Sequence, residues 1–499
     1  MSAAPRPHEH DVVVVGSGPN GLAAAVTLAR AGLEVLVLEA TSTLGGGSRT
    51  EDLGLAPGIR HDLCSAVHPL ALASPFLHRF DLPARGVDLR VPEASYAQVI
   101  GTERSAVAWH DLERTVEGLG PDGPAWRRSV GALAAHAGTV VDLALGDKRS
   151  VPGSLLSPAG VLTAARFGAL LGLQGTPLWD RPLRTERGRA LLAGVAAHAI
   201  GPLPGLAPAA TSLLLASLGH AGGWPVPVGG SQAIADALLA DLRAHGGQVR
   251  TGERVRTWRD VPPARAVLLD TTAPAAAEIL ANRLPGRLER SLRRFRHGDA
   301  AAKVDLVLSG PIPWRDPEVG RAGTQHVGGT RAEMARAEAQ VAAGRTPEDP
   351  MVLVSDPSVA DPSRAVDGLR PVWAYAHVPH GDPTDPTELV LRRLEAMAPG
   401  VRDLVVASHG VPASEMAEHN PSLVGGDIAL GAVTMRAMIA RPTATPDPYR
   451  LGADGWYLCS AATPPGPGVH GMSGWHAARR VLRDRFGIRD LPELAPLPR

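Results

Sequence analysis

A short apolar strand that runs directly into a glycine-rich turn constrains the fold of this chain more than any other feature. Val12 to Val15 form an apolar run suited to a buried parallel strand, and Gly16, Gly18 and Gly21 follow in the spacing G-x-G-x-x-G. The first glycine permits a tight turn, the second lets the backbone approach a pyrophosphate, and the third lets a helix pack on the strand. The pattern predicts a parallel α/β domain that binds a dinucleotide.

The residues after this turn complete a strand–helix–strand unit. Leu22 to Ala31 are predicted to form a helix that ends near Gly32, and Glu34 to Leu38 a second strand. The helix start presents unpaired N–H groups and the positive end of its dipole to phosphates. Glu39, at the tip of the second strand, can accept hydrogen bonds from a ribose diol and would repel a 2′-phosphate. This order of elements argues against a chance glycine-rich turn.

A second glycine-rich loop, Leu44 to Thr50, follows the second strand. Its glycines, Gly46 among them, let backbone N–H groups wrap phosphate oxygens. Arg49 could add charge-assisted contacts to the same group. A flexible linker is the alternative, but the spacing returns this loop to the pyrophosphate.

Composition narrows the class of protein and its partners. The 499 residues suffice for about two domains, and 50 basic residues are balanced by 50 acidic ones. A nucleic acid is therefore not expected as a partner, because there is no basic footprint. The two cysteines, Cys64 and Cys459, form neither a disulfide framework nor a C-x-x-C pair, as expected in a reducing cytoplasm. No apolar run of about 18 residues predicts a membrane span.

Two charged or polar stretches bear on location. Met1 to His10 have no apolar core, so no secretory signal is expected, and His8, Glu9 and His10 are predicted to be solvated rather than to bind a metal. The basic stretch Arg283 to His297 is amphipathic and is expected to be a solvated helix face, with a membrane surface or a partner as the sharper alternative. The predicted location is cytoplasmic, with peripheral membrane contact left open.

The chain leaves the first α/β segment and later returns to it. Region 76–221 is rich in Leu and Ala at helical spacing and lacks a second nucleotide motif, as expected of a substrate-facing part. After residue 222, Ser231 is predicted to be the N-cap of a helix that reaches about Ala244. Residues 303–425 mix strand-like and helical pieces, which predicts a mixed sheet. Further strands are expected at Gln248–Thr251, Ala266–Asp270 and Trp456–Cys459, and a helix from about Gly471.

These blocks together resemble the phytoene desaturase-like branch of the FAD-dependent amine oxidase and carotenoid desaturase superfamily. Within it they are similar to the group that includes pyridine nucleotide-disulfide oxidoreductase domain-containing protein 2. The blocks run in order along nearly the whole chain: Val15-Gly-Ser-Gly-Pro-Asn-Gly, Gly45-Gly-Gly-Ser-Arg-Thr, His61-Asp-Leu-Cys-Ser-Ala-Val-His-Pro, Gly223-Trp-Pro-Val-Pro-Val-Gly-Gly-Ser, Lys303-Val-Asp, Pro313-Trp, Asn420-Pro-Ser, Gly425-Gly-Asp and Cys459 to Ala478.

The resemblance implies an α/β flavoprotein that binds one FAD. A Rossmann-like FAD-binding domain of the glutathione-reductase type would be discontinuous over 8–75, 222–300 and 426–490, with a mixed-sheet plus helical substrate domain over 76–221 and 301–425. The helix that starts near Gly471 would aim its positive end at the flavin edge that becomes negative on reduction. Gly47 stands where amine oxidases usually place an arginine, which leaves the contact of Arg49 open. By matching position, cofactor contacts are expected at Gly16, Gly18, Pro19, Asn20, Gly21, Glu39, Ala40, Gly46, Arg49, Val255, Ser460, Gly471 and Met472.

The implied reaction moves a hydride from a substrate C–H bond to flavin N5, and the cofactor supplies this chemistry. The leading hypothesis is a desaturase or dehydrogenase for a small apolar substrate of the isoprenoid or carotenoid kind. With one nucleotide motif, oxygen or a quinone is the expected electron acceptor. The alternatives are a flavin amine oxidase and a flavin-containing partner- or membrane-associated module. No residue identifies itself as the base; His68 and His470 are weak candidates, each expected rather to hold a loop carbonyl.

Overall fold

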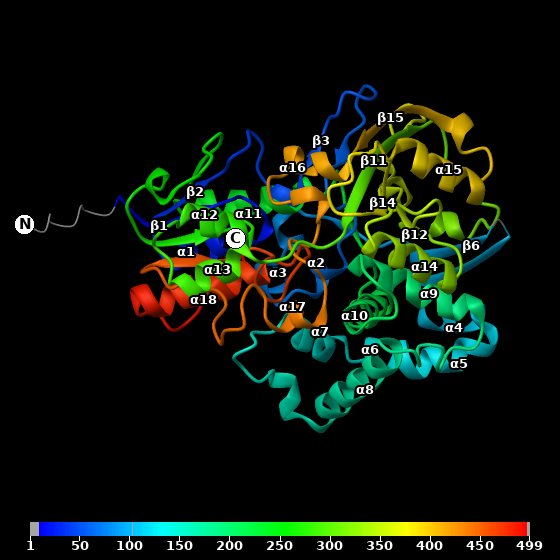
Figure 1. Ribbon diagram of the computed structural model, residues 1–499, viewed down its shortest axis with the longest axis horizontal. Coiled ribbons are helices and arrows are strands. Elements are labelled where there is room, and N and C mark those ends of the chain that lie inside the picture. Colours follow the sequence, from blue (N-terminus) through cyan, green and yellow to red (C-terminus); the bar gives the residue numbers. More distant parts are fainter. Residues whose placement is uncertain (1–8, 102, 497–499) are drawn as a thin grey trace, which may run out of the picture.

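Two β-sheets organise the molecule (Figure 1). The computed structural model describes residues 9–101 and 103–496. The first sheet is parallel and five-stranded, in the order β16-β10-β1-β2-β9. The second is mixed and seven-stranded, in the order β15-β11-β14-β13-β12-β6-β7. This confirms the predicted fold class, a Rossmann-like parallel sheet joined to a mixed-sheet and helical part.

Three separate stretches of the chain supply the first sheet. Its inner strands are continuous apolar runs, because helices cover both of its faces. The predicted strands all exist, with each end within two residues of its predicted place. The strands are β1 (His10–Val15), β2 (Val35–Leu38), β9 (Gln248–Arg250), β10 (Ala264–Leu269) and β16 (Trp456–Leu458).

The helices of the first sheet divide between its two faces. Val12 and Val14 of β1 pack toward α1 (Pro19–Arg30), α11 (Gln232–Ala244) and α18 (Met472–Phe486). The opposite face packs on α12 (Ala273–Ile279) and α13 (Gly286–Arg293). A Cβ atom on Gly474 would lie 1.8 Å from the carbonyl oxygen of Asn20, so α18 packs directly on the start of α1.

The start of α11 differs from the prediction in one respect. Ser231 has helical backbone angles and makes no capping bond to the helix. Its hydroxyl instead donates to the carbonyl of Ser65 and lies 2.7 Å from Nε2 of His68. Ser231 therefore occupies the predicted N-cap position of α11, but its hydroxyl does not cap the helix, because two tertiary partners engage it.

The second sheet is antiparallel except where β12 runs parallel to β6. Helices α14 (Arg331–Ala342) and α15 (Thr387–Met397) pack against it. The strands are β6 (Ala94–Gly101), β7 (Arg104–Trp109), β11 (Ala300–Leu308), β12 (Thr324–Val327), β13 (Val352–Ser355), β14 (Arg370–Val378) and β15 (Val405–Val411). Two small pairs complete the strands: β3 (Thr50–Glu51) with β4 (His61–Asp62), and β5 (Leu89–Arg90) with β8 (Val226–Pro227).

Most of region 76–221 outside β5, β6 and β7 is helical, as predicted, and lies below the second sheet in Figure 1. Its helices, with those of the flanking loops, are α2 (Pro69–Ala73), α3 (Pro75–Phe80), α4 (Leu112–Gly118), α5 (Gly123–Trp126), α6 (Ala132–Ala134), α7 (Ala137–Leu145), α8 (Pro158–Gln174), α9 (Glu186–Ala196), α10 (Leu206–Ala221), α16 (Met416–His419) and α17 (Met435–Ile439). Within the described residues, none of the helices is long and apolar enough to cross a bilayer.

The strands of the two large sheets lie on different sides of the predicted boundaries, whereas one small pair joins β5 of region 76–221 to β8 of region 222–300. Every strand of the first sheet falls in 8–75, 222–300 or 426–490, and β11 of the second sheet begins one residue before the predicted boundary at 301. The boundaries themselves stay a prediction. Of the cluster predicted to be solvated, His8 lies outside the described residues, Glu9 is exposed, and His10 is half-buried at the start of β1.

A buried carboxylate beside the first sheet binds two arginines that also contact the carboxyl-terminal segment. Asp241 of α11 accepts two hydrogen bonds from Arg30, at 2.7 and 2.8 Å, and one from Arg85 at 2.7 Å. The same arginines donate to backbone carbonyls of residues 493–495. Burial disfavours the charged carboxylate, but the hydrogen bond from Arg30 and the charges of Arg85 and Arg30 outweigh it and lower the pKa of Asp241.

We expect Asp241→Asn to lower the free energy of unfolding by about 3 kcal/mol at pH 7, because it leaves two buried guanidinium groups without their counter-charge. The pKa of Asp241 lies below its usual 3.8, so this contribution is present above about pH 4 and fades as the pH falls further. Urea unfolding at pH 7 and pH 3 measures both effects. Asp236→Asn, an exposed change on the same helix, is the matched control. Equal stability of the two variants at pH 7 would contradict the assignment.

Candidate functional site

A cavity of about 960 Å³ runs from the glycine-rich turn to the second sheet. At one end it is lined by residues 15–20 of the turn, and at the other by Thr324, Leu353, Trp373 and Tyr375 of the second sheet. Its volume is at the upper end of the usual range for ligand sites. The cavity therefore joins the two parts of the molecule that the sequence assigned to cofactor and to substrate.

The glycine-rich turn is packed so closely that side chains are excluded. Gly16 has φ +104°, a backbone conformation that favours glycine. A Cβ atom on Gly21 would lie 2.2 Å from the carbonyl oxygen of Gly16, and one on Gly18 would lie 2.7 Å from Oδ2 of Asp270. The turn thus brings the start of α1 against the end of β1, with N–H groups free to face an anion.

The second glycine-rich loop lies directly on the first. A Cβ atom on Gly46, which has φ +55°, would lie 2.7 Å from the Cα of Gly18. Arg49 lines the cavity, but its guanidinium donates to the Gly46 carbonyl, to Thr43 and Glu51, and to the carbonyl of His419. Arg49 therefore holds the second glycine-rich loop to the backbone at His419. The flexible-linker alternative does not fit this packing.

Glu39 lies at the end of β2 with its carboxylate held in place. One oxygen accepts from the backbone N–H of Ser17 at 2.9 Å and from its hydroxyl at 2.6 Å. The other accepts from the N–H and hydroxyl of Thr41, at 2.9 and 3.0 Å. Two of these four donors are rotatable hydroxyls, which leaves lone pairs of Glu39 that a ribose diol can take over.

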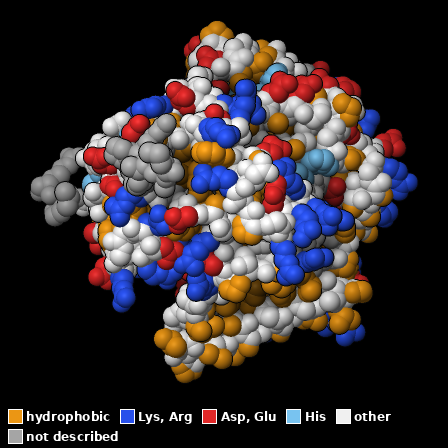
Figure 2. All heavy atoms as spheres, turned by 60° about the vertical axis from the view of Figure 1, so that its left-hand side comes forward, with side chains coloured by type: hydrophobic (Ala, Val, Ile, Leu, Met, Phe, Trp, Pro, Cys, Tyr) orange, Lys and Arg blue, Asp and Glu red, His pale blue; other side chains and the backbone are white. Residues whose placement is uncertain are grey.

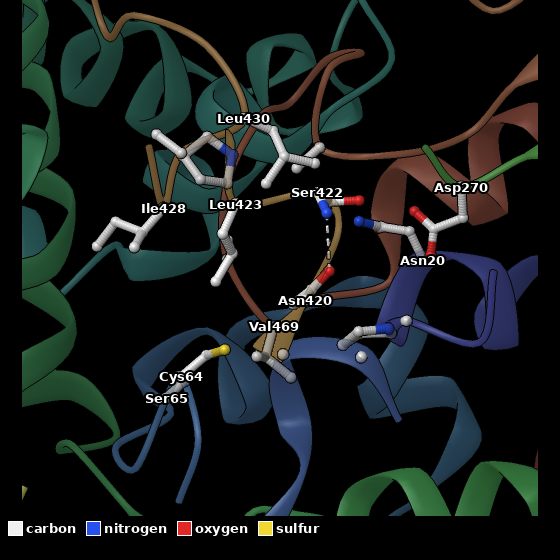
Figure 3. A pocket seen from close by; sticks show the side chains of 18 of the residues that line it. Asn20, Cys64, Ser65, Asp270, Asn420, Ser422, Leu423, Ile428, Leu430 and Val469 are labelled. Atoms are coloured by element: carbon white, nitrogen blue, oxygen red, sulfur yellow. Dashed lines mark hydrogen bonds between the residues drawn. The ribbon is translucent and has the colours of Figure 1, made fainter. Parts of the chain in front are cut away.

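Two polar side chains beside the turn, Asn20 and Asp270, line the cavity (Figure 3). Asn20 is buried and its Oδ1 atom has no hydrogen-bond partner. Asp270, at the end of β10, accepts the Gly21 N–H at 2.9 Å. Burial, with a smaller effect from the charge of Glu39, raises the pKa of Asp270 to about 7. Free donors, an unsatisfied acceptor and a half-protonated acid fit the pyrophosphate and ribose of a dinucleotide.

The structure separates the predicted contact residues into two sets. Those that do not line the cavity are Gly21, Ser460, Gly471 and Met472. Gly471 has φ +68° and packs on Phe76 and Ala23, and the Ser460 hydroxyl donates to the carbonyl of Thr271. Those that line the cavity are Gly16, Gly18, Pro19, Asn20, Glu39, Ala40, Gly46, Arg49 and Val255.

The two histidines proposed as weak base candidates differ in position. His68 lines the cavity, and its Nδ1 atom is buried without a partner. His470 does not line it; its ring contacts the carbonyl of Gly466 and accepts the N–H of Met472 at 3.0 Å. Burial lowers the pKa of each imidazole to about 4, so both are neutral at pH 7. His470 therefore holds a loop carbonyl, which is the structural role that the sequence analysis expected for it.

Two further histidines, which no sequence motif identified, are in contact beside the cavity. His198, which follows α9, lines the cavity, and its Nε2 lies 2.8 Å from Nε2 of His326 on β12. Burial lowers the pKa of His198 to about 3, so one shared proton links two neutral rings. Trp224 packs edge-on against His198 at 5.5 Å. No local pattern could reveal this pair, because its members are 128 residues apart.

The cysteines show no sign of redox pairing. Both are free; Cys64 lines the cavity, and Cys459 is fully buried between the first sheet and helices α1 and α18. Burial raises the pKa of both thiols, which keeps them protonated at pH 7. They act as small apolar side chains.

Comparisons with known proteins agree with this geometry. The family of NAD(P)-binding Rossmann-like domains matches residues 14–80. Pyridine nucleotide-disulfide oxidoreductase domain-containing protein 2 of Rattus norvegicus is 24% identical, over 95% of this chain and 94% of its own. Hydroxyneurosporene desaturase of Cereibacter sphaeroides is 27% identical, over 95% and 97%.

A solved structure of a putrescine oxidase variant has the same fold, with a TM-score of 0.59 and 18% identity over 96% of this chain and 99% of its own. The resemblance stated from the sequence is thereby confirmed. The parallel sheet with its glycine-rich turn is a Rossmann-like unit, and residues 14–80 match the NAD(P)-binding family of such domains.

We expect Glu39→Ala to weaken FAD binding by about 10- to 100-fold, since charge-assisted hydrogen bonds to a carboxylate contribute roughly 1.5–3 kcal/mol. Fluorescence titration of the apoprotein with FAD measures the dissociation constant. Glu34→Ala removes the same charge from the opposite, exposed end of β2 and serves as control. Unchanged affinity in Glu39→Ala would mean that the ribose lies elsewhere.

Proposed function

We propose that this chain is an FAD-dependent oxidoreductase, a desaturase or dehydrogenase that acts on an apolar substrate. The observation that carries the proposal is the cavity itself, which is continuous from the dinucleotide-binding turn to a mostly apolar chamber. The chamber is lined by Leu143, Leu145, Phe167, Leu171, Leu214, Leu215, Leu353, Ile428, Leu430, Val433, Met435 and Met438. When bound, FAD would supply hydride-accepting chemistry at the junction of the two halves.

The positions of the acids around the cavity argue against a cationic substrate. Among the described residues that line it, the acids are Glu39, Glu253, Asp270 and Glu278, and all four belong to the segments of the first sheet. The apolar chamber therefore offers no carboxylate to an ammonium group. His68 and His198 face it as neutral imidazoles, which can hold or pass a proton without placing a full charge in the chamber.

A flavin amine oxidase is the second candidate, and one observation favours it. The rings of Trp373 and Tyr375 both face the cavity and stand nearly perpendicular, with centroids 5.2 Å apart and an interplanar angle of 82°. Two such faces could hold an amine through cation–π attraction. Of the proteins that resemble this chain, hydroxyneurosporene desaturase corresponds to the first candidate and putrescine oxidase to the second.

Anaerobic mixing of the FAD-loaded protein with two substrate panels tests the proposal. Apolar polyenes and cyclic or acyclic isoprenoid hydrocarbons are expected to bleach the flavin absorbance, whereas primary amines and polyamines are not. Mass analysis of the product should show loss of two hydrogens, and readmission of oxygen or addition of a quinone should restore the colour. Bleaching by amines alone, with peroxide formed in air, would replace the proposal by the second candidate. Bleaching by neither panel would leave the third hypothesis, a flavin-containing module.

A further inference from the structure

An apolar surface protrudes from the helical part of the molecule. We call it the α8 lobe; it comprises residues 151–178, with η5 (Gly153–Leu156) and α8. Leu156 is 85% exposed, Val151 73%, Leu162 60% and Val161 54%. Figure 2 shows this lobe at the bottom, covered largely by hydrophobic side chains.

The polarity of α8 is the reverse of that expected for a helix facing water. Its exposed positions are Pro158, Ala159, Val161, Leu162, Ala165, Gly168, Ala169 and Gly172, none of which is polar. Its buried positions include Thr163 and Gln174, and its one charged residue is Arg166. A helix on a soluble surface turns its polar side outward, so this one is built for a neighbour less polar than water.

The lobe adjoins the opening of the cavity. Phe167 and Leu171 of α8 line the cavity together with Met435, Met438 and Ile439 of α17. Ile439 is also 69% exposed, so the cavity reaches the surface between α8 and α17. The exposed apolar surface is therefore continuous with the apolar chamber.

Basic side chains flank the lobe: Lys148 and Arg149 precede it, Arg166 lies within it, and Arg436 lies on α17. The neighbouring acids are held in ion pairs, Asp147 with Arg480, Asp180 with Arg331, and Asp447 with Arg149 and Arg480. Lys148, Arg149 and Arg436 are exposed, although Arg149 also contacts Asp447. This combination of an apolar face with flanking Lys and Arg matches an anionic lipid surface, where apolar side chains enter the acyl boundary and cations meet the phosphates.

We propose that the α8 lobe and α17 dock on an anionic lipid bilayer and bring the cavity opening to its acyl region. The inference rests on the proposed function in one respect: an apolar substrate would then pass from lipid to cavity without crossing water. The proposed membrane contact thus lies at the α8 lobe and not at residues 283–297, the stretch that the sequence analysis had considered. The basic stretch 283–297 contains α13, whose Leu292 is fully buried, so that stretch presents charges without an apolar face to insert.

Sedimentation of the purified FAD-loaded protein with vesicles tests the docking. Binding is expected to vesicles that contain phosphatidylglycerol, to be weaker on pure phosphatidylcholine, and to weaken as salt is raised. The double variant Val161→Glu/Leu162→Glu should lower the partition coefficient at least about tenfold, since two apolar side chains are lost and two repelled charges gained. Its flavin content and melting temperature should not change, because neither residue lines the cavity.

Val406→Glu is the matched control, since Val406 is 54% exposed on β15 and lies outside the cavity wall, and it should bind vesicles as the parent does. Equal loss of binding in both variants, or no binding by the parent, would overturn the docking. So would sedimentation velocity showing a dimer that the double variant dissociates, which would assign the lobe to a second copy. Vesicle binding requires no turnover, so a protein that binds vesicles but whose flavin no substrate reduces would refute the proposed function alone.

Discussion

Gly21→Val is expected to yield a protein that retains no FAD, with a dissociation constant raised more than about 100-fold. A Cβ atom at this position would lie 2.2 Å from a backbone oxygen, that of Gly16, and 2.9 Å from Oδ2 of Asp270. Backbone atoms cannot turn aside as a side chain does, so α1 must move away from β1. That movement breaks the turn and withdraws the helix start from the phosphates. Absorbance at the flavin band after purification, and FAD titration of the apoprotein, measure the loss.

Two further variants separate loss of the site from loss of the fold. Gly138→Val places the same side chain at an exposed position of α7, where a Cβ atom meets nothing within 4 Å, and should retain flavin. Gly18→Ala meets only the carboxylate of Asp270, so it should fold and bind FAD about tenfold more weakly. Stoichiometric FAD in Gly21→Val would show that the turn does not hold the cofactor.

Asp270→Asn is expected to remove a pH dependence from FAD binding. In the parent, the pKa of Asp270 is raised to about 7 because the half-buried carboxyl at the cavity wall is poorly solvated, with the charge of Glu39 adding to the effect. The ionised form would repel a pyrophosphate held at the adjacent turn, and the protonated form can donate to it. Affinity should therefore be constant below about pH 7 and fall up to about tenfold per pH unit above it.

The same substitution should also remove a pH dependence from the free energy of unfolding of the apoprotein. The folded pKa of about 7 lies above the usual 3.8, so the folded state binds more protons between these values and loses stability as the pH rises from about 4 to 7. The loss is at most about 4 kcal/mol, from 1.36 kcal/mol per pKa unit. Asparagine keeps the acceptor for the Gly21 N–H and has no proton to lose.

Asp270→Asn should bind FAD more tightly than the parent at pH 9 and equally at pH 6. Parallel pH profiles of FAD affinity in the two proteins would contradict the role given to Asp270.

The sequence predicted what depends on neighbouring residues and missed what depends on tertiary contact. The turn at Gly16 to Gly21 and the acid at Glu39 follow from local spacing, and the strands around them were placed within two residues. Asp270 meets Gly21 across 249 residues, so only the sheet order reveals it as a neighbour of the turn.

Tertiary contacts decided two details that local spacing could not. Ser231 precedes its helix as predicted, but its hydroxyl binds the Ser65 carbonyl instead of capping the helix. Gly471 stands at the start of α18 as predicted and packs on Phe76 outside the cavity wall, because α18 lies against α1; its contact with the cofactor stays a prediction. The outward apolar side of α8 could not be distinguished from an inward one, since periodicity shows that a helix has two sides and not which of them is covered.

The most direct test of the account is the flavin content of the purified chain. Protein that is denatured after saturation with FAD and gel filtration should release one FAD per chain, seen as a yellow supernatant with the mass of the intact dinucleotide. The Glu39→Ala and Gly21→Val variants should release progressively less. A colourless chain that takes up no FAD from solution would contradict the central claim, and the redox function proposed for the cavity would fail with it.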